Sequence, residues 1–192
     1  FLSSPKQVDC CLEFLHGNPD SLKVVDPVMG DNGKPYSTYT PELIRRMKEL
    51  VDAADVITPN LTETCMLLGE ECPPVMSVAQ ARSWLARLSD KPGIVVIKGV
   101  PLIDDDGQKL SNVVFDKDSG SFWRIDWDHI PVHYPGTGDI FTSVLTASLL
   151  KGESLPIALN RATTFTEIAV KTTYSYGTEP RLGVLFEDCL SW

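Results

Sequence analysis

A glycine-rich segment, Gly136-Thr137-Gly138-Asp139, precedes a stretch rich in serine, alanine and leucine that is typical of a helix. The two glycines let the backbone turn tightly and approach a ligand, and the N–H groups at the helix start point toward that ligand. This arrangement suits a phosphoryl group in transfer, and Asp139 could accept the proton of an attacking hydroxyl. Because Gly, Thr and Asp also favour helix starts, plain capping is the competing interpretation.

Asn60 and Glu63 form a second candidate pair, directly after an apolar strand. On a helix their side chains share one face, where they could orient Mg²⁺-bound water near phosphates. The alternative is a capping box, with Asn60 as the N-cap and Glu63 three residues later.

Charged side chains also mark the ends of two further strands. Asp26 and Asp31 lie in the segment Asp26-Pro27-Val28-Met29-Gly30-Asp31, at the end of a buried strand. A charge there requires compensation, for which a cation or a magnesium nucleotide is a candidate, although Asp31 could simply bond the N–H groups of a turn. Lys98 ends another apolar strand, where its ammonium could meet phosphate oxygens or be solvated.

His129 and His133 lie in the loop before the glycines. Their spacing suggests a metal site, but no third ligand accompanies them. We therefore expect this loop to line a nucleotide pocket.

Apolar strands alternate with amphipathic helices along the chain. This pattern predicts an α/β fold with a mostly parallel sheet, whose ligands bind at the carboxyl ends of the strands. No linker or repeat interrupts it, so we expect a single domain over residues 1–192. The expected helices are 5–15, one that opens at Thr40-Pro41 with Thr40 as N-cap and carries apolar residues up to Val51, 60–68, 78–88, 139–150 and 155–173; the expected strands are 22–28, 55–58 and 93–97, followed by a hairpin over 110–125 with its turn at 117–120.

The composition is that of an ordinary globular protein, with 192 residues, 43% hydrophobic and 22% charged. A net charge of −9 and a pI near 4.7 argue against nucleic acid as a partner. No apolar run is long enough to span a bilayer, so we expect no membrane partner. The five cysteines form no CxxC pair, which favours reduced thiols in a cytoplasmic protein.

The ordered set of motifs resembles the pyridoxal kinase family of the ribokinase superfamily. The resemblance runs from Leu2-Ser3-Ser4-x-x-Gln7, through the Asp26–Asp31 segment and Thr58-Pro59-Asn60-x-x-Glu63, to Gly136-Thr137-Gly138-Asp139. It implies a three-layer α/β/α ribokinase-like fold, of which this chain would be the ATP-binding and catalytic portion with the N-terminal strands missing. It also implies a homodimer.

By this resemblance each candidate residue receives a role. Asp139 would contact the substrate and act as the base that activates its hydroxymethyl group, and Gly136, Thr137 and Gly138 would form an anion hole. Asp31 and Glu63 would serve the metal. The residues implied for ATP are Asp26, Tyr36, Thr58, Asn60, Glu63, Lys98, His129, Ile130 and Val132.

The implied activity is ATP-dependent phosphorylation of the 5′-hydroxymethyl group of pyridoxal, pyridoxamine or pyridoxine, which gives pyridoxal 5′-phosphate or its analogues in vitamin B6 salvage. Mg²⁺ would accompany ATP, and a monovalent cation such as K⁺ is a further candidate cofactor. The nearest rival is a hydroxymethylpyrimidine kinase of thiamine synthesis. Many of these kinases carry cysteine in place of Asp139, so the aspartate favours the pyridoxal branch. A truncated nucleotide-binding module without activity is the third alternative.

Overall fold

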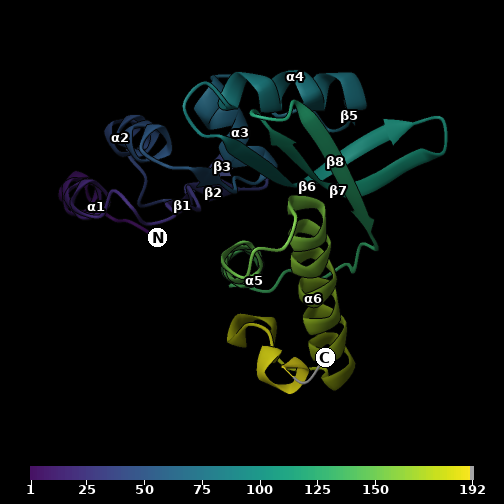
Figure 1. The fold of residues 1–192 in the computed structure, drawn as a ribbon. Helices are drawn as coiled ribbons and strands as arrows, with labels where there is room; N and C mark the ends of the chain where they lie inside the picture. Colours follow the sequence, from purple (N-terminus) through teal and green to yellow (C-terminus); the bar gives the residue numbers. More distant parts are fainter. Residues whose placement is uncertain (191–192) are drawn as a thin grey trace. The chain divides into compact units, whose positions relative to one another are not determined.

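The computed structural model describes residues 1–190. The chain divides into two compact units, Phe1–Arg124 and Ile125–Trp192. The first unit carries the sheet with its helices, and the second carries the helices that follow the glycine-rich turn (Figure 1). The single domain expected over residues 1–192 stays a prediction.

The central sheet is mixed and mostly parallel, as the alternating pattern predicts. Its strand order is β1-β4-β6-β7-β8, with β5 paired to β6. The β1–β4, β4–β6 and β5–β6 pairs are parallel, whereas β6 and β7 run antiparallel. The strands span β1 (Val24–Val25), β4 (Val56–Ile57), β5 (Met76–Ser77), β6 (Ile94–Asp104), β7 (Gly107–Asp116) and β8 (Ser121–Trp127).

The middle of the sheet consists of β-branched residues with no exposed surface, among them Val56, Ile57 and Ile97. Such side chains pack well on a pleated surface that is buried on both sides. The strand expected at 22–28 is wrong in length, because only Val24–Val25 pair with β4. The strand expected to end at 97 continues to Asp104, and its antiparallel partner begins at Gly107 rather than 110.

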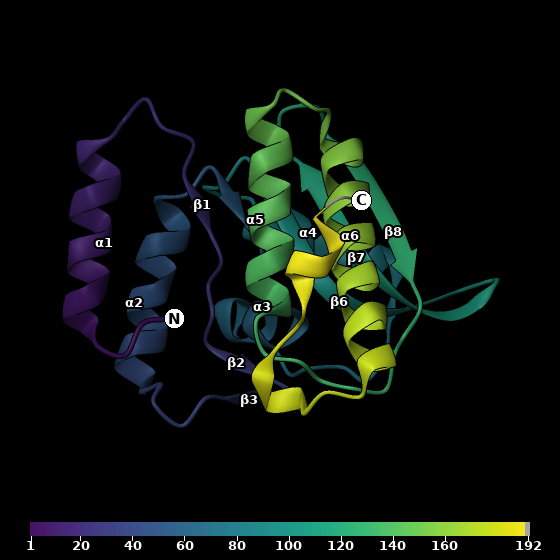
Figure 2. The ribbon, with the colours of Figure 1, turned by 90° about the horizontal axis from the view of Figure 1, so that it is seen from below.

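Helix α2 begins at the predicted cap, where the Thr40 side chain accepts a hydrogen bond from the N–H of Leu43. Ser77, for which no cap was predicted, does the same for Gln80 at the start of α4. Helices α1 and α2 pack side by side (Figure 2), and α4 packs on β6 and β7 (Figure 1). Their bounds are α1 (Pro5–Gly17), α2 (Pro41–Asp52), α3 (Leu61–Leu68) and α4 (Val78–Leu88).

A small hairpin lies between β1 and α2, where no strand was predicted beyond residue 28. Strands β2 (Gly30–Asp31) and β3 (Lys34–Pro35) pair antiparallel across the turn Asn32-Gly33. Both turn residues have positive φ, 51° and 75°. This is the backbone of a type I′ turn, which Asn-Gly favours because both residues tolerate the left-handed region.

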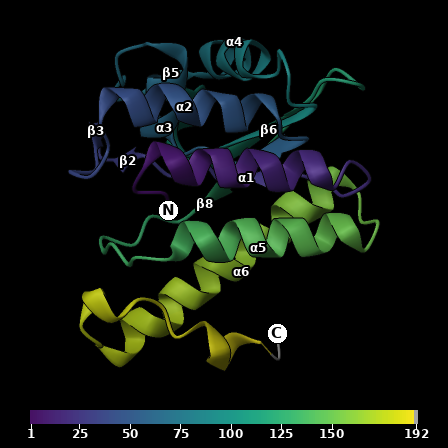
Figure 3. The same ribbon diagram turned by 90° about the vertical axis from the view of Figure 1, so that its left-hand side faces the viewer.

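The second unit is helical. Helix α5 (Thr137–Leu150) packs against α6 (Leu155–Tyr176), as Figure 3 shows. The short 3₁₀ helices η1 (Pro180–Leu182) and η2 (Phe186–Cys189) follow, and Cys189 joins a small core with Phe165 and Ala169. Among residues 1–190, no helix is long and apolar enough to cross a membrane.

Gly30 is needed where it stands, because a Cβ there would lie 2.3 Å from the carbonyl oxygen of Lys34 and 2.9 Å from Cε of Met66. We therefore expect Gly30→Ala to lower the free energy of unfolding by about 1–3 kcal/mol, measured by urea denaturation. Gly17→Ala is the matched control, since a Cβ at Gly17 has no atom within 4 Å. Equal stability of the two variants would contradict the close packing of the hairpin.

Candidate active site

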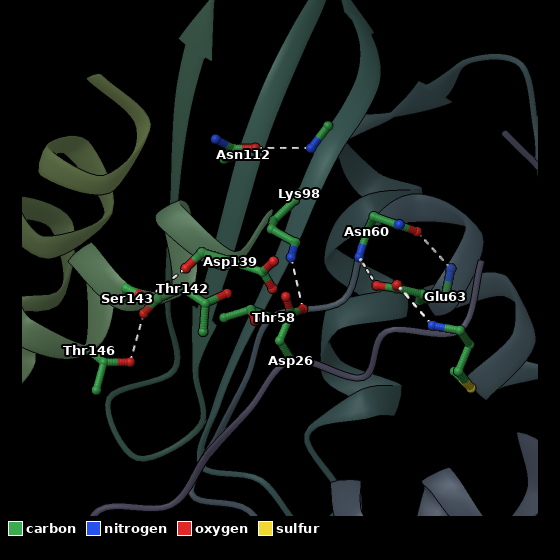
Figure 4. Close-up of polar contacts among 12 residues, drawn as sticks. Asp26, Thr58, Asn60, Glu63, Lys98, Asn112, Asp139, Thr142, Ser143 and Thr146 are labelled. Carbon is green, nitrogen blue, oxygen red and sulfur yellow. Dashed lines mark hydrogen bonds and ion pairs between the residues drawn. The ribbon is translucent and has the colours of Figure 1, made fainter. Parts of the chain in front are cut away.

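The carboxylate of Asp26, just after β1, joins three segments that are distant in the sequence. Its Oδ1 accepts hydrogen bonds from the Thr58 hydroxyl at 3.1 Å and the Lys98 ammonium at 2.8 Å (Figure 4). Thr58 follows β4, and Lys98 lies in β6. The structure thus brings together three predicted residues from neighbouring strands of the sheet.

The ion pair between Asp26 and Lys98 is largely removed from solvent, with side chains 13% and 14% exposed. Desolvation opposes such a pair, and the attraction between the charges together with the Thr58 hydrogen bond offsets it. Removing one charge would leave the other buried and uncompensated, at a cost of about 3–5 kcal/mol. An ammonium has three N–H donors, so Lys98 can hold Asp26 and still donate to a second acceptor such as a phosphate oxygen.

The predicted capping box at the start of α3 is confirmed. Oδ1 of Asn60 accepts from the N–H of Glu63 at 2.9 Å, and Oε2 of Glu63 accepts from the N–H of Asn60 at 2.7 Å. The same side chains also reach the segment after β1. Oε1 of Glu63 accepts from the N–H of Met29, and the Asn60 amide donates to the carbonyl of Gly30. The box therefore fixes both the helix start and the 26–31 segment (Figure 4).

Glu63 is almost fully buried, at 2% exposure. Burial raises the pKa of the Glu63 carboxyl to about 7; the nearby Lys98 lowers this pKa, Asp26 raises it, and the N–H bonds from Asn60 and Met29 lower it. The charge of Glu63 is therefore set by its surroundings near neutral pH. A cation arriving nearby would favour the ionised form.

Asp31 and Tyr36 flank the hairpin of β2 and β3. The Asp31 carboxylate accepts from the N–H and the side-chain amide of Asn32, which matches the turn interpretation of this residue. Tyr36 donates its N–H to the carbonyl of Met29 and is 40% exposed. Their proposed roles toward metal and ATP remain predictions.

The carboxylates fit a magnesium ion held mainly through nucleotide phosphates. Within residues 1–190, no three His, Cys, Asp or Glu side chains gather into a set that could hold a metal ion. Mg²⁺ does not require such a set, because it keeps several waters and binds one or two carboxylates plus phosphate oxygens. Asp26 is partly exposed and fits this role. Glu63 has both oxygens bonded to N–H groups, so its position fits an action through water.

In the second unit, Gly136 ends the glycine-rich loop with a φ of 90°, which glycine adopts without strain. Helix α5 then begins at Thr137, so the N–H groups of its first turn lack intrahelical partners. Such groups suit an anion, and their predicted role as an anion hole stays a prediction. Asp139 is exposed in this turn, and its carbonyl accepts from the Ser143 hydroxyl (Figure 4). The local geometry suits both interpretations of the segment, capping and catalysis.

The predicted nucleotide loop precedes this turn. His129 and His133 are exposed, whereas Ile130 and Val132 are half-buried. A short turn forms where the N–H of Val132 donates to the carbonyl of Ile130 at 2.7 Å. The role of this loop in binding ATP stays a prediction.

Some contacts around Asp26 and Glu63 leave little trace in the sequence. Met29 takes part through its N–H group, which any residue type would supply. The Thr62 hydroxyl accepts from the N–H of Gly33 and ties the hairpin turn to α3. Nothing in the spacing of Thr62 indicates this partner.

Similarity to known proteins extends over the residues that carry the motifs. A model of the phosphomethylpyrimidine kinase family matches residues 1–182. The chain belongs to this family. A hydroxymethylpyrimidine/phosphomethylpyrimidine kinase of Haemophilus influenzae is 30% identical over 176 residues, which cover 92% of this chain and 65% of that protein. The pyridoxal kinase PdxY of Burkholderia mallei is 25% identical over 181 residues, covering 91% of this chain and 61% of that protein.

Solved structures of both kinds of kinase resemble the chain. A Bacteroides thetaiotaomicron protein assigned as a phosphomethylpyrimidine kinase has a TM-score of 0.92 and 41% identity, over 98% of this chain and 65% of that one. Its crystal form with pyridoxal has a TM-score of 0.90, over 98% of this chain and 66% of that one. The pyridoxal kinase of Lactobacillus plantarum has a TM-score of 0.87 and 29% identity, over 100% of this chain and 67% of that one.

These relatives confirm the predicted membership of the pyridoxal kinase-like family and its ribokinase-like fold. They also support the alternative substrate considered from the sequence, hydroxymethylpyrimidine. The 41% identical Bacteroides protein is assigned as a phosphomethylpyrimidine kinase. The chain spans 65% of the length of the Haemophilus relative and 61% of the Burkholderia one.

The raised pKa of Glu63 predicts that the fold loses stability as the pH rises. Below about pH 4.5 the carboxyl is protonated in both folded and unfolded chains, and between pH 4.5 and 7 only the folded chain keeps the proton. The free energy of unfolding should therefore fall across this window, by on the order of 3 kcal/mol. Glu63→Gln keeps one acceptor oxygen, enough for the capping box, and loses the acceptor for the N–H of Met29. It should therefore lower stability at all pH values and remove this part of the pH dependence.

The measurement is urea denaturation at several pH values between 4.5 and 8. Glu42→Gln, at an exposed glutamate in the first turn of α2, is the control and should keep the wild-type profile. Parallel profiles for wild type and Glu63→Gln would show that burial of Glu63 does not shift its ionisation.

Proposed function

We propose that the protein is an ATP-dependent kinase that phosphorylates the 5′-hydroxymethyl group of pyridoxal, pyridoxamine or pyridoxine. The observation that carries the proposal is the start of α5, where Asp139 is exposed in the first turn behind the left-handed Gly136. An anion site next to a carboxylate is what phosphoryl transfer to an alcohol requires, because the reaction needs charge stabilisation and a proton acceptor.

The first unit supplies groups for the phosphates of ATP. Lys98 is held by Asp26 with its ammonium partly exposed, and it would donate to phosphate oxygens. Asn60 and Glu63 keep the 26–31 segment against α3, so Asp26 is fixed before the nucleotide arrives. Preorganised charges of this kind do not have to reorient during the reaction.

The second unit supplies the proton acceptor. The substrate hydroxyl oxygen attacks the γ-phosphorus of ATP, the bond from that phosphorus to the β–γ bridging oxygen breaks, and ADP leaves. Asp139 accepts the hydroxyl proton during the attack. The N–H groups behind Gly136, with Thr137 and Gly138, stabilise the charge on the transferring group.

Mg²⁺ bound with ATP would neutralise phosphate charge, with Asp26, Asp31 and Glu63 as the candidate carboxylates and water between protein and metal. A monovalent cation such as K⁺ is a further proposed cofactor. The loop containing His129, Ile130 and Val132 is assigned to the nucleotide, as are Tyr36 and Thr58. We further propose that the protein works in the cytoplasm as a homodimer.

Two findings support a B6 vitamer as the substrate. The 41% identical Bacteroides protein was crystallised with pyridoxal, and the Lactobacillus relative, which matches 100% of this chain and 67% of its own length, is a pyridoxal kinase. Aspartate at position 139 also fits the pyridoxal branch, by the resemblance described for the sequence.

Hydroxymethylpyrimidine is the second candidate substrate. It is supported by the family model over residues 1–182 and by the Haemophilus relative at 30% identity. Both candidates present a hydroxymethyl group on an aromatic ring, so the same proton acceptor and phosphate groups would serve either one.

Steady-state kinetics with MgATP distinguish the candidates. We expect kcat/KM for pyridoxal to exceed that for hydroxymethylpyrimidine by about tenfold or more, a difference of about 1.4 kcal/mol in transition-state binding. A sugar with a primary hydroxyl is the control and should be phosphorylated far more slowly. A preference for hydroxymethylpyrimidine would replace the first candidate by the second, and ATP binding without transfer to any alcohol would leave a nucleotide-binding module.

Asp139→Asn is expected to lower kcat by about 10²–10⁴-fold while ATP affinity, measured by calorimetry, stays near the wild-type value. The amide keeps the shape of the carboxylate in the first turn of α5, but it cannot take the hydroxyl proton. Asp188→Asn, at an exposed aspartate in η2, is the matched control and should retain full turnover. Near-normal turnover of Asp139→Asn would reduce this residue to a helix cap.

A further inference from the structure

Strand β6 contains a β-bulge at Lys98, where the sequence analysis expects the strand to end. Ile97 faces Val113 of β7, and the next aligned pair is Val100 with Ser111. Two residues of β6, Lys98 and Gly99, therefore lie opposite a single residue of β7, Asn112. A bulge of this kind interrupts the ladder of hydrogen bonds and re-aims the side chains of the bulged strand.

The Asn112 side chain replaces the hydrogen bond that the bulge removes. Its Oδ1 accepts from the N–H of Gly99 at 2.9 Å, as Figure 4 shows. Gly99 has a φ of 63°, in the left-handed region that glycine tolerates best. Asn112 is 6% exposed. Leaving the N–H of Gly99 without an acceptor beside it would therefore lower the stability of the fold.

On its other side, the bulge is fixed to the end of β4. The N–H of Lys98 donates to the carbonyl of Pro59 at 2.8 Å, and Lys98 forms a parallel bridge with Asn60. The backbone at Lys98 and Gly99 is thus held from both neighbouring strands. From this position the Lys98 ammonium reaches Asp26 at 2.8 Å.

We propose that Asn112 is a positioning residue for Lys98: by accepting the N–H of Gly99 it holds the bulge that directs the Lys98 ammonium to Asp26 and to the phosphates of ATP. The inference rests on the proposed function in one respect, the role of Lys98 toward ATP. The effect on the Asp26–Lys98 pair itself does not depend on that role. Asn112 acts through the backbone of its neighbour and contacts no substrate.

Asn112→Leu is the informative substitution, because leucine has a similar size and cannot accept a hydrogen bond. We expect KM for MgATP to rise by about tenfold while KM for the alcohol substrate changes by less than about twofold. Val113→Ala is the matched control: it removes buried volume from the adjacent β7 residue, which faces Ile97 instead of the bulge. It should lower thermal stability and leave both KM values unchanged.

Two further measurements separate positioning from general damage. In a double-mutant cycle with Lys98→Met, the added Asn112→Leu substitution should change kcat/KM for ATP by less than about twofold, because the two residues act through one ammonium. The second measurement needs no activity. Acetylation by an amine-reactive ester, followed by mass spectrometry, should modify Lys98 about fivefold faster in Asn112→Leu than in wild type or Val113→Ala.

Each possible result of these measurements either supports or overturns the positioning role of Asn112. Unchanged acetylation of Lys98 in Asn112→Leu, or additive effects in the cycle, would overturn the proposal. An equal rise of KM for MgATP in Val113→Ala would also overturn it, since any destabilisation of β7 would then suffice. Faster acetylation of Lys98 in a protein whose turnover is insensitive to Lys98→Met would support the positioning role and refute the assignment of Lys98 to ATP.

Discussion

The Asp26–Lys98 ion pair is the interaction on which the organisation of the first unit depends. It joins the end of β1 to the middle of β6, and Thr58 adds the end of β4 through the same carboxylate oxygen. The strands β1 and β4 contain two residues each and could not hold these positions by their own ladders. A mostly buried charge that needs its partner is a strong constraint, because breaking the pair costs more than forming it gains.

Burial, with smaller and opposed effects of these two charges, determines the pKa of Glu63. Its carboxylate is required in the folded chain as an acceptor for two backbone N–H groups, one from α3 and one from the segment after β1. It is nevertheless buried next to Asp26, so its ionised form is disfavoured. This combination costs stability at neutral pH. Such a cost is common where a fold keeps a charge for binding, and a cation bound nearby would relieve it.

The sequence predicts most of the fold because its elements carry local signals. Helix α2 has Thr40 and Pro41 at its start, and α4 has the predicted bounds, since caps and apolar spacing act within one element. The turn Asn32-Gly33 also carries a usable signal, the preference of Asn-Gly for type I′ turns, although the predicted elements include no hairpin at these residues. The length of β1 could not be predicted, because it depends on how far β4 extends beside it.

In the candidate site, too, some residues can be predicted from the sequence and others cannot. Asp26, Thr58 and Lys98 could be placed together because the carboxyl ends of parallel strands meet at one edge of a sheet. Asn112 could not be found, since its partner is the N–H of Gly99 across an antiparallel pair whose register only the folded sheet defines. A glycine inside an apolar strand, as in Ile97-Lys98-Gly99-Val100, is nevertheless a known sign of a bulge.

Substrate choice depends on a different part of the chemistry from phosphoryl transfer. Asp139, the N–H groups behind Gly136 and the ammonium of Lys98 would act on the hydroxyl and on ATP, which both candidate reactions share. Discrimination between a pyridine and a pyrimidine has to come from groups that bond the ring substituents, where one unmatched polar group alters specificity far more than one methylene does. Relatives assigned to either substrate are therefore expected for a chain with this phosphate-handling set, as the Haemophilus and Burkholderia proteins illustrate. By the resemblance described for the sequence, position 139 would differ between the two branches, with aspartate in one and often cysteine in the other. A carboxylate there accepts a proton directly, whereas a cysteine must first lose its own, so the exchange of one for the other changes the chemistry without changing the fold.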